Sequence, residues 1–233
     1  MEDCEDFNVL KVLTRITGKL VNVTPMRIGG YRETQQGAAD LTPIKIRIKG
    51  KEIPYIPGSS LKGAMRSLAE AILRAKDVNV HDPWDSDAIE REEQEKRYCP
   101  ICGIFGNTKI ASHVRVFDAY PDENAQTFLK TGVGINRDFR GAQPGVLYTE
   151  ELVLPMTKWK FRMDIINIRV FPEPEGERAK LLRTIIDMLT KGMIQIGARK
   201  TVGYGTLKLE DGKYEVFEVI EGSIRKVHEG EIV

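Results

Sequence analysis

The chain is poor in cysteine, histidine and aromatic residues, and these shortages exclude several classes of protein. It has three cysteines and three histidines in 233 residues, and aromatic residues make up 7% of it. So few cysteines, odd in number, argue against a secreted module built on disulfides, so we expect a cytoplasmic location. No apolar run approaches the roughly 20 residues that cross a bilayer, so no membrane partner is expected. The acidic start, Met1 to Asp6, lacks the basic and apolar parts of a secretory signal.

Charge is balanced over the whole chain but not along it. Lys and Arg number 35 and Asp and Glu number 34, so net charge alone indicates no partner. Residues 43–76 hold eight basic and two acidic residues, whereas residues 77–97 hold three basic and eight acidic ones. Residues 190–208 are basic without any acid. Such blocks fit a protein that shows one face to a polyanion, or ordinary surface charge that happens to cluster.

The hydrophobic pattern predicts an α+β protein. Hydrophobic residues make up 41% of the chain, enough for a core. Alternation or even spacing of apolar residues predicts strands over residues 9–23, 44–49, 113–118, 158–170, 204–209 and 214–220. Helical spacing predicts helices from 58 onward and over 177–193, with a serine N-cap for the first, and the charged stretch 85–97 is expected to be a solvated helix. Asp211-Gly212 is predicted to be a tight turn. The order is typical of a ferredoxin-like sheet with helices on one face, and residues 24–42 are expected to form a long loop.

The start of the first helix, Pro57-Gly-Ser-Ser-Leu-Lys-Gly-x-x-Arg66, has the chemistry of an anion site. Exposed N–H groups and the positive end of the helix dipole point outward there. Two hydroxyls and two cations add phosphate ligands, namely Ser59, Ser60, Lys62 and Arg66. The alternative is a capped helix with solvated cations.

A second motif, Gly197-Ala-Arg-Lys-Thr-Val-Gly-Tyr-Gly205, is rich in glycine near the C-terminus. Its glycines, Gly197, Gly203 and Gly205, allow the backbone to approach a ligand closely. Arg199 and Lys200 supply positive charge, and Tyr204 could stack on a base. A glycine-rich loop is a weak signal when it stands alone.

Cys99-Pro-Ile-Cys102 is half of a zinc site, because tetrahedral zinc needs four ligands. His81 is a candidate third ligand, and Cys4 or Asp82 could supply a fourth. A degenerate site, a redox pair and a disulfide remain open alternatives. His113 and His228 are expected to be packed or exposed residues without a catalytic role.

Together, the helix motif and the glycine-rich loop resemble those of the RAMP superfamily of CRISPR-associated proteins. Within it the chain is most similar to the backbone subunit of type III effector complexes, over most of residues 9–210. The resemblance implies one RAMP domain over 1–233, with a modified ferredoxin-like (RNA-recognition-motif-like) core. It implies a Cys-containing insertion at 77–112 and a thumb-like hairpin insertion at 131–155. The implied partners are CRISPR RNA, target RNA, copies of the same chain and other effector subunits.

The resemblance also implies which residues bind RNA. The cations and the glycine-rich loop would hold guide phosphates, while base pairing reads the sequence. Arg27 lies where relatives often place a basic residue near RNA. Arg137 and Arg140 in the thumb-like hairpin would order on RNA, although that segment alone is also compatible with a plain surface hairpin.

Catalysis, by the same resemblance, would rest on Asp40 and a divalent metal, magnesium or manganese, in endoribonuclease cleavage of paired target RNA. Glu33 is the nearest rival, and Asp40 could instead be a turn aspartate. The alternatives are a non-catalytic structural subunit, a guide-processing endoribonuclease and a generic binding module. Guide-processing relatives usually use a histidine near the first strand or helix, and residues 1–80 contain none.

Overall fold

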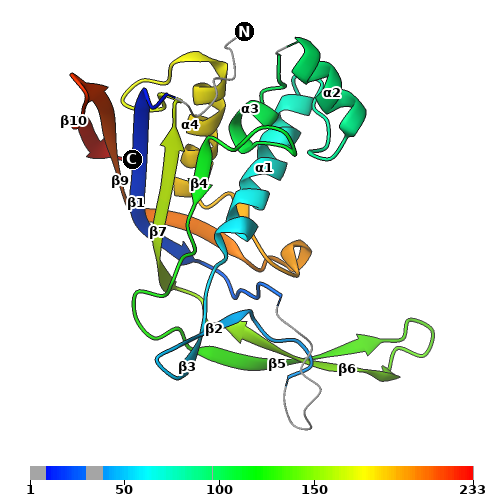
Figure 1. Ribbon diagram of the computed structural model, residues 1–233. Helices are drawn as coiled ribbons and strands as arrows, with labels where there is room; N and C mark the ends of the chain where they lie inside the picture. The colour runs from blue at the N-terminus through cyan, green and yellow to red at the C-terminus, as the bar shows by residue number, and fades with distance from the viewer. Residues whose placement is uncertain (1–8, 30–38, 96, 233) are drawn as a thin grey trace.

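The computed structural model describes residues 9–29, 39–95 and 97–232 and shows a mixed α/β molecule built on one curled antiparallel sheet (Figure 1). The sheet order is β10-β9-β1-β7-β4, with β8 paired to β9. Its strands are β1 (Val12–Asn22), β4 (Val114–Val116), β7 (Thr157–Ile166), β8 (Ile194–Gln195), β9 (Thr206–Ile220) and β10 (Ser223–Glu231). The helices are α1 (Gly58–Arg74), α2 (Ser86–Glu95), α3 (Cys102–Phe105) and α4 (Gly176–Thr190), with a 3-10 turn η1 (Lys200–Val202).

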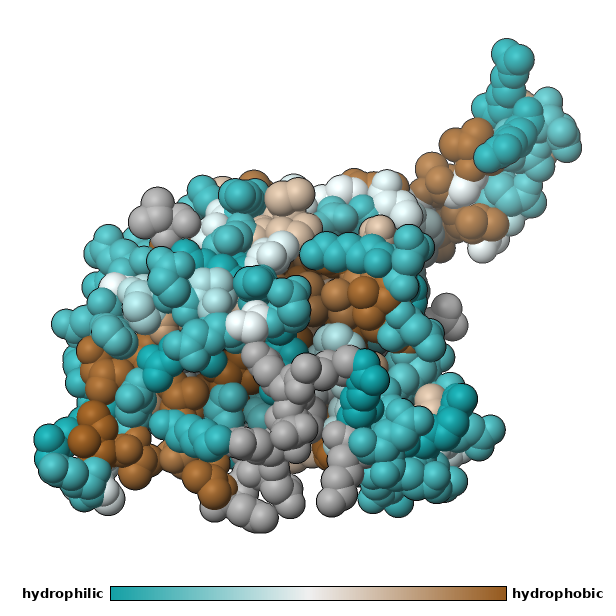
Figure 2. All heavy atoms as spheres, turned by 90° about the horizontal axis from the view of Figure 1, so that it is seen from above, coloured by the Kyte–Doolittle hydropathy of each residue, from teal (hydrophilic) through white to brown (hydrophobic). Residues whose placement is uncertain are grey.

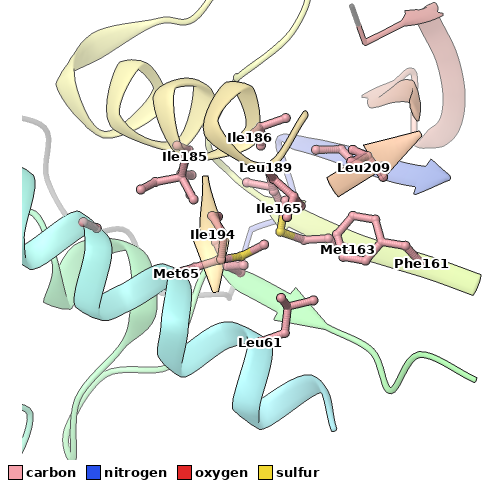
Figure 3. Packing of buried hydrophobic residues seen from close by; sticks show 14 of the residues in the cluster. Leu61, Met65, Phe161, Met163, Ile165, Ile185, Ile186, Leu189, Ile194 and Leu209 are labelled. Carbon is pink, nitrogen blue, oxygen red and sulfur yellow. The ribbon is translucent and has the colours of Figure 1, made fainter. Parts of the chain in front are cut away.

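The core lies between the sheet and the two long helices, α1 and α4 (Figure 3). Alternate residues of β7, from Trp159 to Ile165, are buried because a strand with one covered face points every second side chain inward. Leu61 and Met65 of α1 meet this face from the same side as Ile185 and Leu189 of α4. The structure therefore confirms a mixed α/β protein in which the two long helices cover one face of the sheet.

The predicted turn at Asp211-Gly212 is wrong. Strand β9 runs through these residues, and β1 pairs with it on both sides of them. Thr17 lies opposite Lys213 but Lys19 lies opposite Glu210, so β9 carries one extra residue, which is a β-bulge. Asp211 takes a positive φ of 51° there. The residues that favour a tight turn are also those that favour a bulge, and pairing with β1 decides between them.

The predicted serine N-cap of α1 is also wrong. The helix begins at Gly58 as expected, but Pro57 occupies the N-cap position and no side chain caps from there. The N–H of Gly58 instead donates to Oδ1 of Asp118 at 2.8 Å. The cap therefore comes from 60 residues away in the sequence. Ser59 is left exposed beside the helix start.

Two hairpins stand outside the main sheet, β2–β3 (Lys45–Ile48 and Lys51–Pro54) and β5–β6 (Thr127–Ile135 and Ala142–Val153). The second projects from the body as an arm (Figures 1 and 2). It starts four residues before the predicted hairpin at 131–155. Several large apolar side chains on this arm are exposed, namely Leu129, Val133, Ile135, Phe139, Val146 and Leu147.

The remaining helices lie close to the predicted ranges, with α2 inside 85–97 and α4 beginning one residue before the predicted 177–193. The segment 77–112 contains α2 and α3 and lies at one end of α1 (Figure 1). Strands β8 and β10 were not predicted. In the parts of the chain that the structure describes, no helix is both long and apolar enough to span a bilayer.

Candidate nucleic-acid interface

The two sequence motifs line one open groove, with a volume of about 510 Å³, between α1 and the segment 193–200. On the α1 side it is lined by small or polar residues, including Ser60, Gly63 and Ser67, and by the apolar Leu68. On the other side lie Gly197 and Lys200 together with the apolar Met193, Ile194 and Ile196. Because Gly63 has no side chain, the groove stays open along the helix. The arrangement joins hydroxyls, exposed backbone and one cation, which together can hold a phosphate.

The glycine-rich loop takes its shape from close backbone contacts. Gly197 has a φ of +79°, and a Cβ on it would lie 2.3 Å from the carbonyl oxygen of Arg27. The N–H of Ala198 donates to that same oxygen at 2.9 Å. Gly205, with a φ of +76°, approaches Ile196 even more closely. These two glycines are therefore required for packing, whereas Gly203 has open space around it.

A buried carboxylate joins the loop to the arm. Glu150 of β6, with a side chain only 3% exposed, binds Nε of Arg199 at 2.9 Å and lies 3.7 Å from Nε of Arg27. Arg199 also stacks on the ring of Tyr148, 4.5 Å from its centroid. Despite some burial, Glu150 and the side-chain bond to Tyr148 raise the pKa of Arg199. Glu150 therefore offsets the positive charge of the buried Arg27 and of the partly exposed Arg199.

Asp40 lies at the root of the arm. Its Oδ2 accepts the backbone N–H of Thr149 at 2.7 Å, and the side chain is exposed. The next residue, Leu41, pairs in parallel with Glu150. The same short stretch of β6 thus holds the aspartate and the junction with Arg199. Glu33, the rival candidate, lies outside the described residues.

Lys62 and Arg66 do not line the groove. Burial, followed by repulsion from Arg66, lowers the pKa of Lys62. Arg66 donates from Nε to Glu70 at 2.9 Å and from Nη1 to the carbonyl of Gly106 at 2.8 Å. Its guanidinium therefore faces the 77–112 segment.

The other candidates are divided between the loop and the tip of the arm. Tyr204 is buried and its hydroxyl bonds Lys130 of β5, whose ammonium also lies 5.0 Å from the ring centroid. That contact raises the pKa of Lys130. Tyr204 is thus occupied by a strand of the arm. Arg137 and Arg140 are exposed in the turn between β5 and β6.

A second cluster lies in the 77–112 segment. Potential ligand atoms of His81, Glu92, Cys99 and Cys102 all lie within 4.8 Å of one another. Nε2 of His81 is 2.9 Å from Glu92 and 3.7 Å from Sγ of Cys102. Its Nδ1 is directed at the carbonyl of Asp82, 2.9 Å away, which leaves Nε2 facing the cluster. The two cysteines are free thiols, so the disulfide alternative is wrong, and Cys4 lies outside the described residues.

The charges within this cluster are strongly coupled. The side-chain bond to Cys102, together with burial, raises the pKa of the Cys99 thiol. The same bond lowers the pKa of Cys102. Burial would lower the pKa of His81, but the bond to Asp82 and the nearby Cys99 and Glu92 raise it overall.

The donor set fits a closed zinc site. Two sulfurs, an imidazole nitrogen and a carboxylate oxygen are four ligands of the kinds that zinc takes in proteins, with no position left for a substrate. Among the residues that the structure describes, this is the one cluster of three or more such ligands, and Asp40 is not part of it. A divalent ion at Asp40 would draw on that carboxylate. That matches the way magnesium is held by one or two carboxylates and substrate phosphates.

The sequence prediction did not assign Glu92 and Glu150 to the candidate sites, although the position of each relative to a buried residue indicates that it faces inward. Glu92 was expected on a solvated helix, yet it lies three residues after Ile89, the buried residue of α2, and so shares its face. Glu150 lies two residues before the buried Leu152 and so shares the inward face of β6.

Comparison with known proteins gives the family. The model of the RAMP superfamily matches residues 19–208. The protein named CRISPR system Cms endoribonuclease Csm3 of Methanocaldococcus jannaschii is 30% identical over 82% of this chain and 75% of its own length. The protein of that name from Methanothermobacter thermautotrophicus is 34% identical over 42% of this chain and 34% of its own. The protein of that name from Enterococcus italicus is 46% identical over 23% of this chain and 25% of its own length. The chain therefore belongs to the RAMP superfamily.

Proposed function

We propose that this chain is an RNA-binding backbone subunit of a type III CRISPR effector complex, and that it cleaves target RNA paired to the guide. The observation that carries the proposal is the groove in which the helix motif and the glycine-rich loop meet. The names of the Csm3 relatives support the same assignment. Its partners would be guide RNA, target RNA, further copies of the chain and other subunits.

The proposed core is a modified ferredoxin-like fold. The order β1–α1–β4–β7–α4–β9 is that of a β-α-β-β-α-β unit, and the sheet order β9-β1-β7-β4 places its first and third strands at the centre. The segment 77–112 and the β5–β6 arm would then be insertions, the arm being the thumb-like one. Exposed apolar residues along the arm support a role in contacting another molecule.

The proposed RNA path follows the groove. Lys200, Ser60 and the backbone around Gly197 would hold phosphates and sugars, so the binding would be independent of sequence. Arg27 and Arg199 would act mainly through the shape of the loop, because Glu150 engages both. Arg137 and Arg140 would contact RNA from the arm.

The proposed reaction is attack of a 2′-hydroxyl of target RNA on the adjacent phosphorus. The 2′-hydroxyl gives up its proton to water as a 2′-oxygen–phosphorus bond forms, the bond from phosphorus to the 5′-oxygen breaks, and that oxygen takes up a proton, leaving a 2′,3′-cyclic phosphate and a 5′-hydroxyl. A bound magnesium or manganese ion would supply charge stabilisation. Asp40 would hold that ion through its carboxylate, while the N–H of Thr149 orients the carboxylate from the protein side.

The cleavage test uses the chain assembled with guide RNA, a matching labelled target and magnesium. Asp40→Ala should lower the cleavage rate at least about 100-fold, in the range by which loss of one key catalytic group lowers rates. The matched control is Asp187→Asn on α4, where the carboxylate pairs with Arg183 at the surface. Equal cutting by wild type and the Asp40 variant would remove Asp40 from the reaction.

The alternative is a non-catalytic structural subunit, which shares every RNA-binding feature. Failure of the wild-type assembly to cut with magnesium or manganese would favour it. A guide-processing endoribonuclease would instead cut precursor RNA without metal. Among the three histidines, His81 belongs to the metal cluster, His113 is buried against β7 and His228 is exposed on β10. That placement argues against a histidine base in the groove.

We further propose that His81, Glu92, Cys99 and Cys102 hold a structural zinc ion. The closeness of their ligand atoms supports this assignment. When bound, zinc would contribute folding energy to the 77–112 segment. Purified wild-type protein should contain about one zinc per chain by elemental analysis, and Cys99→Ser should contain much less. Wild-type protein that neither carries nor takes up zinc would refute the site.

A further inference from the structure

Arg66 belongs to the helix motif that the sequence assigned to phosphate binding, but its contacts lead elsewhere. Its side chain is only 15% exposed. Nε and Nη1 bond Glu70 and the carbonyl of Gly106, and Nη2 lies 4.0 Å from Sγ of Cys102. We infer that Arg66 is a positioning residue of the metal centre, which it supports from outside the ligand set. This inference rests on the proposed zinc site.

The first support is geometric. Cys102 begins α3, and Gly106 follows its last residue with a φ of +78°. The N–H of Gly106 donates to the carbonyl of Cys102, and Arg66 bonds the carbonyl of Gly106. Arg66 therefore contacts both ends of the short helix that carries one metal ligand. It fixes that helix against α1.

The second support is charge. Two thiolates and one carboxylate around a dipositive ion leave one net negative charge, with the imidazole neutral. Cys102 is completely buried, so water does not solvate its share of that charge. A guanidinium beside the sulfur compensates the charge, and it stays protonated because arginine does so at all ordinary pH values. Arg66 should therefore favour the loaded centre over the empty one.

The third support is a contrast along the same helix. Glu70 also receives Arg74, at 3.7 Å, but the side chain of Arg74 is 52% exposed. In the described contacts Arg74 bonds neither α3 nor the cysteines. Arg66 and Arg74 thus share one carboxylate, and only Arg66 reaches the metal cluster. Arg74 provides a matched control.

The test measures zinc affinity of the full chain by competition with a chromophoric chelator, using zinc alone as the probe. Arg66→Ala should weaken zinc binding about 10- to 100-fold, the usual effect of removing a residue that supports metal ligands. Arg74→Ala should bind zinc like wild type. Cobalt-loaded protein should show thiolate-to-metal absorption that shifts in the Arg66 variant. Arg66→Lys keeps the positive charge but loses the planar guanidinium that donates several hydrogen bonds, so its zinc affinity should lie between those of wild type and Arg66→Ala. It replaces the alanine variant in the test if that variant does not fold.

The outcomes are separable. If wild-type protein binds no zinc, both the zinc site and this inference are overturned. If wild type binds zinc and the Arg66 variants bind it equally tightly with unchanged cobalt spectra, only the inference is overturned. If the Arg66 variants instead show a weaker salt dependence of RNA binding and an unchanged zinc affinity, the inference is likewise overturned, and Arg66 is a phosphate ligand.

Discussion

At the scale of single residues, the glycine-rich loop contains two kinds of glycine. Gly197 and Gly203 both have positive φ values, at +79° and +86°. A Cβ on Gly197 would collide with backbone at 2.3 Å, whereas a Cβ on Gly203 would meet nothing within 4 Å. Backbone cannot yield as a flexible side chain can. An alanine at Gly203 would therefore report the energetic cost of the left-handed backbone alone, whereas an alanine at Gly197 would add the cost of a steric clash.

The first prediction follows from this pair. Gly203→Ala should destabilise the protein by about 1 kcal/mol, from the left-handed backbone alone. Gly197→Ala should cost at least about 2 kcal/mol more, because the segment carrying Arg27 must move. Urea unfolding of both variants measures the difference. Equal losses would mean that the contact with Arg27 is not tight.

Asp164, on the sheet face away from the helices, gives a prediction about pH. Burial would raise its pKa, but hydrogen bonds from Arg162 and Arg15 outweigh burial and lower it. A lowered folded-state pKa means that the carboxylate stabilises the protein above its unfolded pKa of about 3.9. That contribution is lost as the pH falls through the folded-state value. The stability of the wild type should therefore decline below about pH 4 partly through this group.

Asp164→Asn tests this directly. The variant should be less stable than wild type at pH 7 by about 1–3 kcal/mol, the usual contribution of hydrogen bonds to a charged group. The difference should shrink as the pH falls below about 4. Asp122→Asn is the control, since Asp122 is 31% exposed and meets Lys19 and Lys160 at 3.5 and 3.8 Å. A pH-independent difference for Asp164 would contradict the role of its charge.

At the scale of elements, helix α1 packs in the core with one face and lines the groove with another. Leu61 and Met65 pack in the core, while Gly63 and Ser67 line the groove. Glycine weakens a helix interior by about 0.5–1 kcal/mol relative to alanine. A glycine there costs stability, and the proposed role of the groove in RNA binding would give a functional reason for it.

The prediction for α1 separates stability from binding. Gly63→Ala and Gly63→Leu should both stabilise the protein by about 0.5–1 kcal/mol, because Gly63 has no positive φ and a Cβ there meets nothing within 4 Å. Only the leucine variant should fill the groove and weaken guide RNA binding, by about tenfold or more, equal to about 1.4 kcal/mol. Thermal unfolding and an RNA titration of both variants measure the two effects. Normal RNA binding by the leucine variant would place the RNA elsewhere.

Elements whose signals are local were predictable from the sequence. Alternation in β1 and β7 and helical spacing in α1 and α4 place the core correctly, because one-sided burial imposes the period. The cap by Asp118 and the bulge at Asp211 depend on partners distant in the chain. No local pattern encodes a distant partner, so propensity alone assigned a serine cap and a turn.

The candidate site shows the same division. The two motifs were found from sequence, and the structure brings both to one groove. The carboxylates Glu92 and Glu150 lie in polar stretches that resemble solvated surface, and folding alone gives them partners. The assignment of Arg66 to phosphate failed to anticipate its contacts because charge in a motif does not say which way a side chain turns.

At the scale of the whole molecule, near-zero net charge hides an uneven distribution. The chain carries 35 basic and 34 acidic residues. Some cations of the basic segments are paired with carboxylates that are largely buried, including Arg66 with Glu70 and Arg199 with Glu150. Lys200 is exposed and lines the groove. Affinity for RNA should therefore depend on the groove cation Lys200 more than on total charge.

The salt dependence of RNA binding tests this. Each phosphate neutralised on a single strand contributes about 0.7 to the slope of log affinity against log salt, because binding releases condensed counterions. Lys200→Ala should reduce that slope by about 0.7 and weaken binding to all sequences alike. Lys226→Ala should leave the slope unchanged, since Lys226 lies on the edge strand β10 and pairs with Glu215 and Glu229. If both variants reduce the slope equally, binding follows overall charge, and the groove is not the path of the RNA.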